Sequence, residues 1–236
     1  MNTQKYTIPS IRKNLGCGFD PNNLASGREP CQMGWYDMVS TMIQQIVGED
    51  NSEKNILDVG CGMCNGIKKM REKMPNNYKV YGQDIDYRLS NLDENFLSKD
   101  VSQFDDKSFD FITCFDVIEH EENDLEFFNH LKRICKNYIF ITTPNYTRSK
   151  AQNYCHCREY TIPQFFNHFS PDEMWVGTPD GAYCRTKILQ KISDTKTLDL
   201  TRINTFYEGK LNEETSFAHF TNDGHEWPHY LGIFKC

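Results

Sequence analysis

The chain has 236 residues, a formal net charge of −7 at pH 7 and 38% hydrophobic residues. This length suits one α/β domain with appendages, and no apolar run approaches the length of a membrane span. The acidic balance disfavours DNA or long RNA as a substrate, because a negatively charged protein is repelled by phosphate backbones. The first ten residues are polar and lack the apolar stretch of a signal peptide. We therefore expect a cytoplasmic protein without a membrane partner.

Residues 31–47 are predicted to form an amphipathic helix, because apolar side chains recur there at spacings of three and four. Two interpretations of Trp35 and Tyr36 stay open at this point. They either line a substrate pocket or belong to the core, and for Trp35 the core is favoured.

A glycine-rich turn follows the apolar run at residues 55–59. Its sequence is Gly60-Cys61-Gly62-Met63-Cys64-Asn65-Gly66, preceded by Asp58. Helix-compatible residues follow at 67–73, and a second apolar run ends at Asp84. A strand, a glycine turn, a helix and a second strand ending in a carboxylate are typical of nucleoside binding, because the glycines admit the ligand and the carboxylate accepts hydrogen bonds from ribose. The turn is one residue longer than the dinucleotide-binding pattern G-x-G-x-x-G, and the sequence contains no P-loop.

Cysteines are numerous, at ten in the chain. Cys61 and Cys64 form a C-x-x-C pair, but no second pair at zinc spacing completes a site. Cys155-His156-Cys157 is dense in ligand types, although neighbouring positions of an extended segment point to opposite sides. We interpret the cysteines as reduced thiols.

The second half of the chain continues the alternation of strands and helices. Residues 108–115 are predicted as a strand and 124–136 as a helix that Asn123 caps. Residues 137–143 are predicted as a strand that Pro144-Asn145 ends. A short helix is expected from Thr161 to about His168, and a last strand over 229–234. Residues 171–228 are rich in turns and charges, and we expect them to combine a substrate-specific insertion with a further strand.

Asp58-x-Gly60-x-Gly62 resembles the first motif of class I S-adenosylmethionine (SAM)-dependent methyltransferases. That family usually has Gly or another small residue two positions after the second Gly, where this chain has Cys64. Three further segments resemble the family in the same order, and the likeness covers roughly residues 54–170. These segments are Ser108-Phe109-Asp110-Phe111-Ile112, Asp116-Val117-Ile118-Glu119-His120 and His156-Cys157-Arg158-Glu159-Tyr160-Thr161. Within the family, the chain resembles the small-molecule branch and its ubiquinone-pathway and type 11–12 groups.

The resemblance implies an α/β fold of the Rossmann-like kind, with a seven-stranded, mostly parallel sheet and helices on both faces. It implies a helical cover and substrate segment at residues 1–50. The SAM-binding core would then take up residues 51–236, with the insertion at about 145–228. SAM is the implied cofactor and S-adenosylhomocysteine its product. The implied cofactor contacts are Asp58, Gly60, Cys61, Gly62, Asp84, Ile85, Asp100, Val101 and Phe115.

Methyl transfer from a sulfonium is an in-line displacement, and a hydroxyl acceptor must lose a proton as it attacks. His120 and His156 are the candidate catalytic bases, because both are expected at the carboxyl edge of the sheet, where ligands bind in open α/β folds. Each could instead only hydrogen-bond a loop. Arg158 and Glu159 are expected to form a structural ion pair.

A divalent metal is a further alternative, which we do not adopt from sequence alone. Asp116-x-x-Glu119-His120 resembles the E-x-x-E-H arrangement of magnesium-using branches, the ubiquinone-pathway O-methyltransferases and the small-RNA terminal 2′-O-methyltransferases. Two carboxylates and an imidazole suit a divalent ion. However, Asp replaces the first Glu, and the same phrase occurs in family members that use no metal.

We expect a SAM-dependent methyltransferase that acts on a small polar metabolite, at a hydroxyl of a sugar or sugar-nucleotide-like acceptor. The alternatives are N-methylation of a small amine, terminal 2′-O-methylation of RNA, and a SAM-fold scaffold without catalysis. The intact set of Asp58, Gly60, Gly62, Asp84 and Asp100 argues against the scaffold. The sequence sets neither the acceptor atom nor the oligomeric state.

Overall fold

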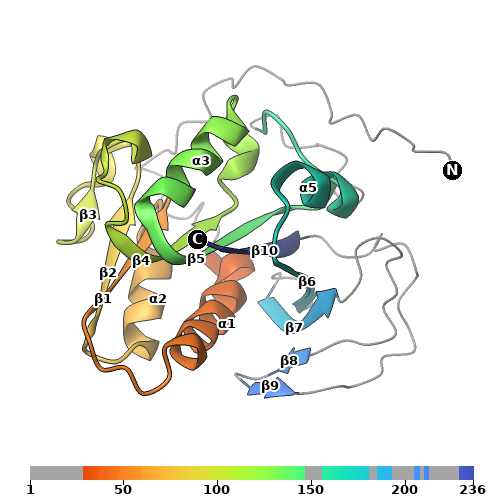
Figure 1. Cartoon of the computed structure of the whole chain (residues 1–236), viewed down its shortest axis with the longest axis horizontal. Helices are drawn as coiled ribbons and strands as arrows, with labels where there is room; N and C mark the ends of the chain where they lie inside the picture. Colours follow the sequence, from red (N-terminus) through yellow and green to blue (C-terminus); the bar gives the residue numbers. More distant parts are fainter. Residues whose placement is uncertain (1–28, 147–155, 181–184, 193–204, 208–209, 213–228) are drawn as a thin grey trace, which may run out of the picture.

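A computed structural model describes residues 29–146, 156–180, 185–192, 205–207, 210–212 and 229–236. Most of the segment expected to cover the substrate, and much of the expected insertion at 145–228, therefore lie outside the described residues. Helices lie on both faces of a central sheet (Figure 1). The α-helices are α1 (Glu29–Val47), α2 (Asn65–Lys73), α3 (Asp124–Ile134) and α5 (Ile162–Phe169). Short 3-10 helices are η2 (Tyr87–Leu89), η3 (Val101–Gln103) and η4 (Ile118–His120).

The sheet has the strand order β3-β2-β1-β4-β5-β10-β6-β7-β8-β9. Its strands are β1 (Lys54–Val59), β2 (Tyr78–Gln83), β3 (Phe96–Leu97), β4 (Phe109–Phe115), β5 (Cys135–Pro144), β6 (Glu173–Asp180), β7 (Arg185–Ile192), β8 (Thr205–Tyr207), β9 (Lys210–Asn212) and β10 (His229–Lys235). Strands β3 to β5 in this order are parallel, and β10 is antiparallel to both β5 and β6. The predicted seven-stranded, mostly parallel sheet is confirmed in the run from β3 to β6. Strands β7 to β9 extend it by antiparallel pairing.

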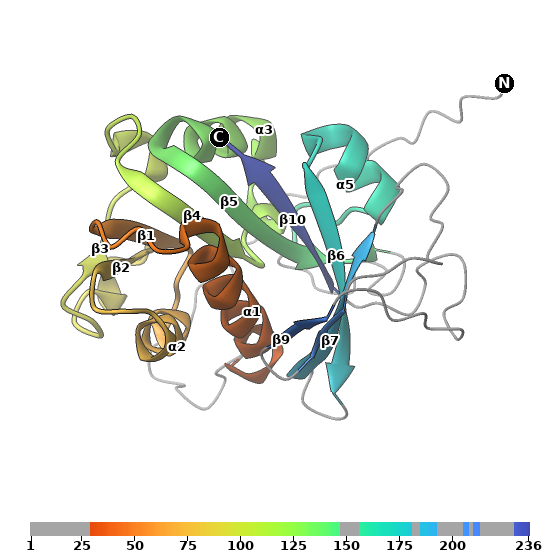
Figure 2. The same ribbon diagram turned by 60° about the horizontal axis from the view of Figure 1, so that its bottom comes forward.

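Two hydrophobic clusters fill the two faces of the sheet, because successive strand residues point to opposite sides. Ile56 belongs to the cluster under α1 and α2, whereas Leu57 belongs to the cluster under α3 and α5. Trp35 of α1 is 1% exposed and lies in the first cluster, so the core interpretation of this residue holds. Figure 2 shows α1 and α2 on one side of the strands and α3 and α5 on the other.

Element boundaries differ from the predictions around α3. The helix ends at Ile134, and Cys135 already adopts an extended conformation that opens β5, two residues before the predicted strand. Asn123 occupies the N-cap position, but its side chain makes no capping hydrogen bond. In α5 the predicted cap is present: Thr161 and Gln164 form a capping box.

No helix within the described ranges has the length and apolar character needed to cross a membrane.

Candidate functional site

The carboxyl ends of the parallel strands meet at one edge of the sheet, where open α/β folds bind their ligands. β1 ends at Val59, β2 at Gln83, β4 at Phe115 and β5 at Pro144. The glycine turn leaves this edge after β1, and η4 leaves it after β4. The edge therefore gathers the segments in which the sequence placed its candidate residues.

The glycine turn, residues 60–66, has three residues in the left-handed region of backbone space. Gly60 has φ 69°, Gly62 φ 49° and Cys64 φ 62°. A side chain at position 60 would also place its Cβ 2.3 Å from Cγ2 of Val117. Gly60 is therefore required both by conformation and by space, whereas Cys64 occupies a conformation that is costly for a residue with a side chain.

Asp84 ties this turn to the end of β2. Its Oδ2 accepts a hydrogen bond from the backbone N–H of Gly62 at 3.1 Å, and its Oδ1 accepts one from that of Asp86 at 2.9 Å. Burial raises the pKa of Asp84, and these backbone hydrogen bonds partly oppose the rise. The turn and the carboxylate expected to bind ribose are thus held side by side.

Large apolar side chains stand exposed just beyond this carboxylate. Ile85 is 75% exposed and Tyr87 is 74% exposed. Asp100 follows β3, the neighbour of β2, and accepts a hydrogen bond at 2.8 Å from the backbone N–H of Ser102. The hydrogen bonds from Ser102 lower the pKa of Asp100, so its carboxyl is ionised. An apolar surface and a carboxylate therefore lie at the same edge of the sheet as Asp84.

Asp58 lies beneath the turn and is fully buried. Its carboxyl accepts hydrogen bonds from Thr113 Oγ1 at 2.6 Å and from the Tyr36 hydroxyl at 2.9 and 3.1 Å. Burial raises the pKa of Asp58 to about 7, although both hydrogen bonds oppose the rise. The side chain predicted as a direct cofactor contact thus joins α1, β1 and β4 to one another.

Tyr36 was predicted either to line a pocket or to fill the core, and it is 4% exposed. Its ring centroid lies 4.7 Å from that of Phe115, at the end of β4. A Cβ at Gly66 would lie 2.0 Å from Cζ of Tyr36. Gly66, the third glycine of the turn, therefore leaves room for Tyr36 of helix α1. In the sequence, the only sign of this role is the glycine itself.

A second group of polar side chains lies at η4. Glu119, His120 and His156 each offer one donor atom, and these atoms lie within 4.8 Å of one another. The rings of His120 and His156 meet edge to face, with centroids 4.8 Å apart. The structure thus brings both candidate bases together, although 36 positions separate them in the sequence.

Glu119 is fully buried in this group. Its Oε2 accepts a hydrogen bond from Thr143 Oγ1 at 3.0 Å, whereas Oε1 has no hydrogen-bond partner among the described residues. Burial, and then the charge of Asp116, raise the pKa of Glu119 well above its usual value. A buried carboxylate oxygen without a partner is costly, and in a functional site it indicates a place for a proton, a substrate group or a cation.

Asp116 belongs to the metal motif that the sequence offered as an alternative, and its carboxylate contacts residues of β5 and β10. Its Oδ1 accepts a hydrogen bond from Thr142 Oγ1 at 3.0 Å, and its Oδ2 lies 3.5 Å from Nε2 of His229 on β10. Its φ of 55° marks a strained turn at the end of β4. His156, a residue that the metal motif in the sequence did not include, takes the third place in the group.

The pairing predicted between Arg158 and Glu159 is wrong. The guanidinium of Arg158 contacts Asp124 of α3, whereas Glu159 Oε1 contacts Nδ1 of His156. Neighbouring side chains of an extended segment point to opposite sides, so Arg158 and Glu159 point away from each other and bind different partners. Asp124 also contacts the Tyr160 hydroxyl and accepts from His168 Nε2 at 3.1 Å.

A family model described as a methyltransferase domain matches residues 36–175, which include the glycine turn, Asp84, Asp100, Glu119, His120 and His156. The chain belongs to this methyltransferase family. The resemblance seen in the sequence is thereby confirmed.

Curated relatives are ubiquinone biosynthesis O-methyltransferases. The chain is 36% identical over 112 residues to that of Rickettsia bellii, covering 42% of this chain and 45% of the relative. It is 27% identical over 115 residues to the mitochondrial enzyme of Dictyostelium discoideum, covering 39% of this chain and 36% of the relative. The matched part thus spans less than half the length of these curated relatives.

Among solved structures, the plantazolicin methyltransferase BpumL in complex with SAH has a TM-score of 0.51 to this chain. Its sequence identity is 16%, and the match covers 67% of this chain and 76% of that one. The likeness shows a shared fold.

Proposed function

We propose that this methyltransferase-family chain binds SAM at the glycine turn and transfers its methyl group to a small acceptor. The observation that carries the proposal is the hydrogen bond between the Gly62 amide and the Asp84 carboxylate, since it sets the glycine turn beside a carboxylate suited to ribose. Exposed Ile85 offers an apolar surface to a purine, and Asp100 an acceptor for its amino group. Gly60, Cys61, Val101 and Phe115 complete the contacts proposed from the sequence.

Asp84→Ala is expected to weaken SAM binding by about 1–3 kcal/mol, because the ribose hydroxyls would lose a charged hydrogen-bond acceptor. This corresponds to a roughly 5- to 150-fold higher Kd, measured by isothermal titration calorimetry. Asp86→Ala is the matched control: its carboxylate pairs with Arg88 and not with the glycine turn. If the Asp84→Ala variant bound SAM with the affinity of the parent, this result would contradict the proposed SAM site.

For the acceptor we propose a hydroxyl of a small polar metabolite, such as a sugar or sugar-nucleotide-like compound. A neutral imidazole of the Glu119–His120–His156 group takes the hydroxyl proton as the oxygen attacks the methyl carbon. The carbon–sulfur bond breaks, its electron pair stays on sulfur, and S-adenosylhomocysteine leaves. The relatives named as O-methyltransferases and the two adjacent histidines support this chemistry over N-methylation, in which a neutral amine attacks without a base. Label transfer from methyl-labelled SAM to sugar nucleotides, small amines or RNA separates the three substrate classes.

A second candidate mechanism uses a divalent cation, and the group at η4 supports it. Glu119, His120 and His156 present one carboxylate and two imidazoles within 4.8 Å, and the carboxylate has one oxygen without a described partner. These three side chains fit a divalent ion, which would draw the acceptor oxygen toward them and favour its deprotonation. Two imidazole donors suit a transition-metal ion such as Zn²⁺, Fe²⁺ or Ni²⁺ better than Mg²⁺, and Mn²⁺, the weakest binder of that series, is the cation that exchanges most readily in an assay.

Chelation decides between the two mechanisms. If a cation is used, we expect methyl transfer to be lost after exhaustive treatment with EDTA and restored by Mn²⁺ at lower concentration than by Mg²⁺. SAM affinity, measured on the same chelated sample, should stay unchanged, because the proposed ligands lie outside the glycine turn. Full activity after chelation would exclude the cation and leave the histidine base.

A further inference from the structure

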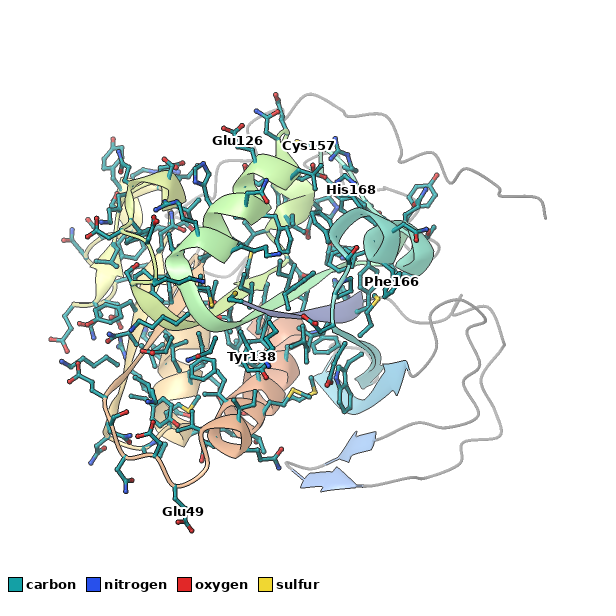
Figure 3. All side chains as sticks on the ribbon, viewed as in Figure 1. Glu49, Glu126, Tyr138, Cys157, Phe166 and His168 are labelled. Carbon is teal, nitrogen blue, oxygen red and sulfur yellow. The ribbon has the colours of Figure 1, made fainter. Side chains whose placement is uncertain are left out.

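The segment Cys157–Tyr160 is anchored to the rest of the fold at three of its residues. The backbone N–H of Arg158 donates to the Glu119 carbonyl at 3.1 Å, and Cys157 Sγ donates to the His120 carbonyl at 3.0 Å. The Arg158 guanidinium and the Tyr160 hydroxyl both contact Asp124 of α3. Figure 3 labels Cys157 between Glu126 of α3 and His168 of α5. The residue between these anchors, Glu159, therefore has a fixed position relative to η4.

Glu159 is 1% exposed, and its Oε1 contacts Nδ1 of His156, which is 7% exposed. A buried carboxylate needs a hydrogen-bond donor, and a neutral imidazole supplies one only when Nδ1 carries the proton. That choice puts the lone pair of the ring on Nε2, at the opposite edge of the imidazole. The ring also meets His120 edge to face, which restricts its rotation.

We propose that Glu159 is a positioning residue for the acceptor site: its carboxylate holds His156 in the Nδ1–H tautomer and directs Nε2 to the acceptor. The proposal rests on the proposed function, in which His156 acts on the acceptor hydroxyl. It applies whether Nε2 takes a proton or holds a cation, because both need the same lone pair. Glu159 touches neither reacting atom in this scheme and acts only through the histidine.

Charged and titratable groups from other elements also face this pair. Glu119 and His120 come from η4, and Asp116 from the end of β4 lies close enough to affect Glu119. The Arg158 charge, next to Glu159 in the sequence, is taken up by Asp124. Glu159 is therefore the carboxylate that the described structure places on Nδ1 of His156.

Kinetics of Glu159→Gln test this role. The amide keeps the size of the side chain, but it can turn its NH₂ group toward Nδ1 and so favour the opposite tautomer. We expect kcat to fall about 10- to 100-fold, the usual effect of removing a carboxylate that orients a functional histidine. The KM for the acceptor and the Kd for SAM should change less than about threefold, and Glu159→Asp should recover part of kcat. Glu126→Gln, an exposed change in the first turn of α3, is the matched control.

A tautomer measurement keeps the test independent of the acceptor. With ¹⁵N-labelled histidine, the two ring nitrogens of His156 should show the Nδ1–H form at a pH where imidazoles are neutral, and Glu159→Gln should change that pattern. The Nε2–H form in the parent, or a kcat for Glu159→Gln equal to that of the control, would overturn the proposal. SAM binding without transfer to any acceptor would instead count against the proposed function, while the tautomer result still decides this one.

Discussion

Replacing His156 is expected to lower kcat for methyl transfer about 10²- to 10⁴-fold, the usual contribution of a positioned general base. The histidine lies in the group at η4 that combines two imidazoles with a buried carboxylate. Without it, an attacking hydroxyl would have to lose its proton to water or to His120, and the ring that Glu159 orients would be gone. The affinity for SAM should stay near that of the parent, because SAM binding is assigned to the glycine turn and Asp84, whereas His156 belongs to the group at η4.

Two variants are needed, because His156→Ala also leaves Glu159 buried without its partner and can lower stability. His156→Gln keeps an N–H group for Glu159 and most of the volume, so its loss of kcat reports on chemistry. His130→Gln, on a half-buried histidine of α3, should keep its activity. Initial rates with saturating SAM, together with melting curves, are the measurements. A His156→Gln variant with kcat within a few-fold of the parent would place proton removal elsewhere.

Sequence separation alone does not divide what was predicted from what was missed: the Gly62–Asp84 and Tyr36–Asp58 hydrogen bonds both join positions 22 apart. The glycine turn, Asp84 and the strands around them depend on contacts within about thirty residues, and local spacing was enough to place them. The bond between Tyr36 and Asp58 joins positions 22 apart, but α1 can lie over the sheet in many ways, and only packing selects one. Gly66 was read as part of the cofactor turn, whereas its lack of a side chain also admits Tyr36.

The membership of the Glu119–His120–His156 group could be recognised only from the three-dimensional path of the chain. Asp116 seemed to be the natural partner of Glu119 and His120, because the three stand within five positions of one another. However, the turn at Asp116 directs its carboxylate to Thr142 and His229, which come from β5 and β10. His156 replaces it because the segment after β5 returns to η4 and bonds to the Glu119 and His120 carbonyls. Contacts of this kind have no local sequence signal, so the motif alone could not show that His156, and not Asp116, lies beside Glu119 and His120.

The extra strands were missed for a different reason. Strands β7 to β9 pair antiparallel beyond β6, and their sequences mix charged and apolar residues without strict alternation. Strands with such composition have weak periodicity, and the surrounding turns and charges were read as an insertion. The final strand, β10, was predicted because its apolar run is continuous, and the structure shows that most of this run is buried.

The second large effect that we expect is a dependence of the free energy of unfolding on pH, and it comes from Asp58. Its pKa is about 7 in the folded chain against 3.8 for the free side chain, so the folded state binds the proton more tightly. Stability from this group is fully present below about pH 4 and is lost as the pH rises to about 7. A difference of about 3 pKa units corresponds to roughly 4 kcal/mol in the free energy of unfolding.

Asp58→Asn removes the titration while keeping an acceptor oxygen for Thr113 and Tyr36. We expect the free energy of unfolding of the parent to fall, relative to this variant, by about 4 kcal/mol between pH 4 and pH 7.5. Urea unfolding at several pH values measures both curves. For Asp100→Asn we expect the opposite pH dependence. Hydrogen bonds from Ser102 lower the pKa of Asp100, so the stability that this carboxylate gives the parent is lost as the pH falls.

Parallel curves for the parent and Asp58→Asn would show that Asp58 stays ionised and that the two hydroxyl donors offset its burial. That outcome would make Tyr36 and Thr113 more important than the protonation state. Tyr36→Phe separates the cases, since it removes one donor: an ionised Asp58 would then be strongly destabilised, and a protonated one much less. In either case the pairing of Tyr36 with Asp58 links α1 to the base of the glycine turn, so the same measurement shows how firmly this helix is held over the proposed SAM site.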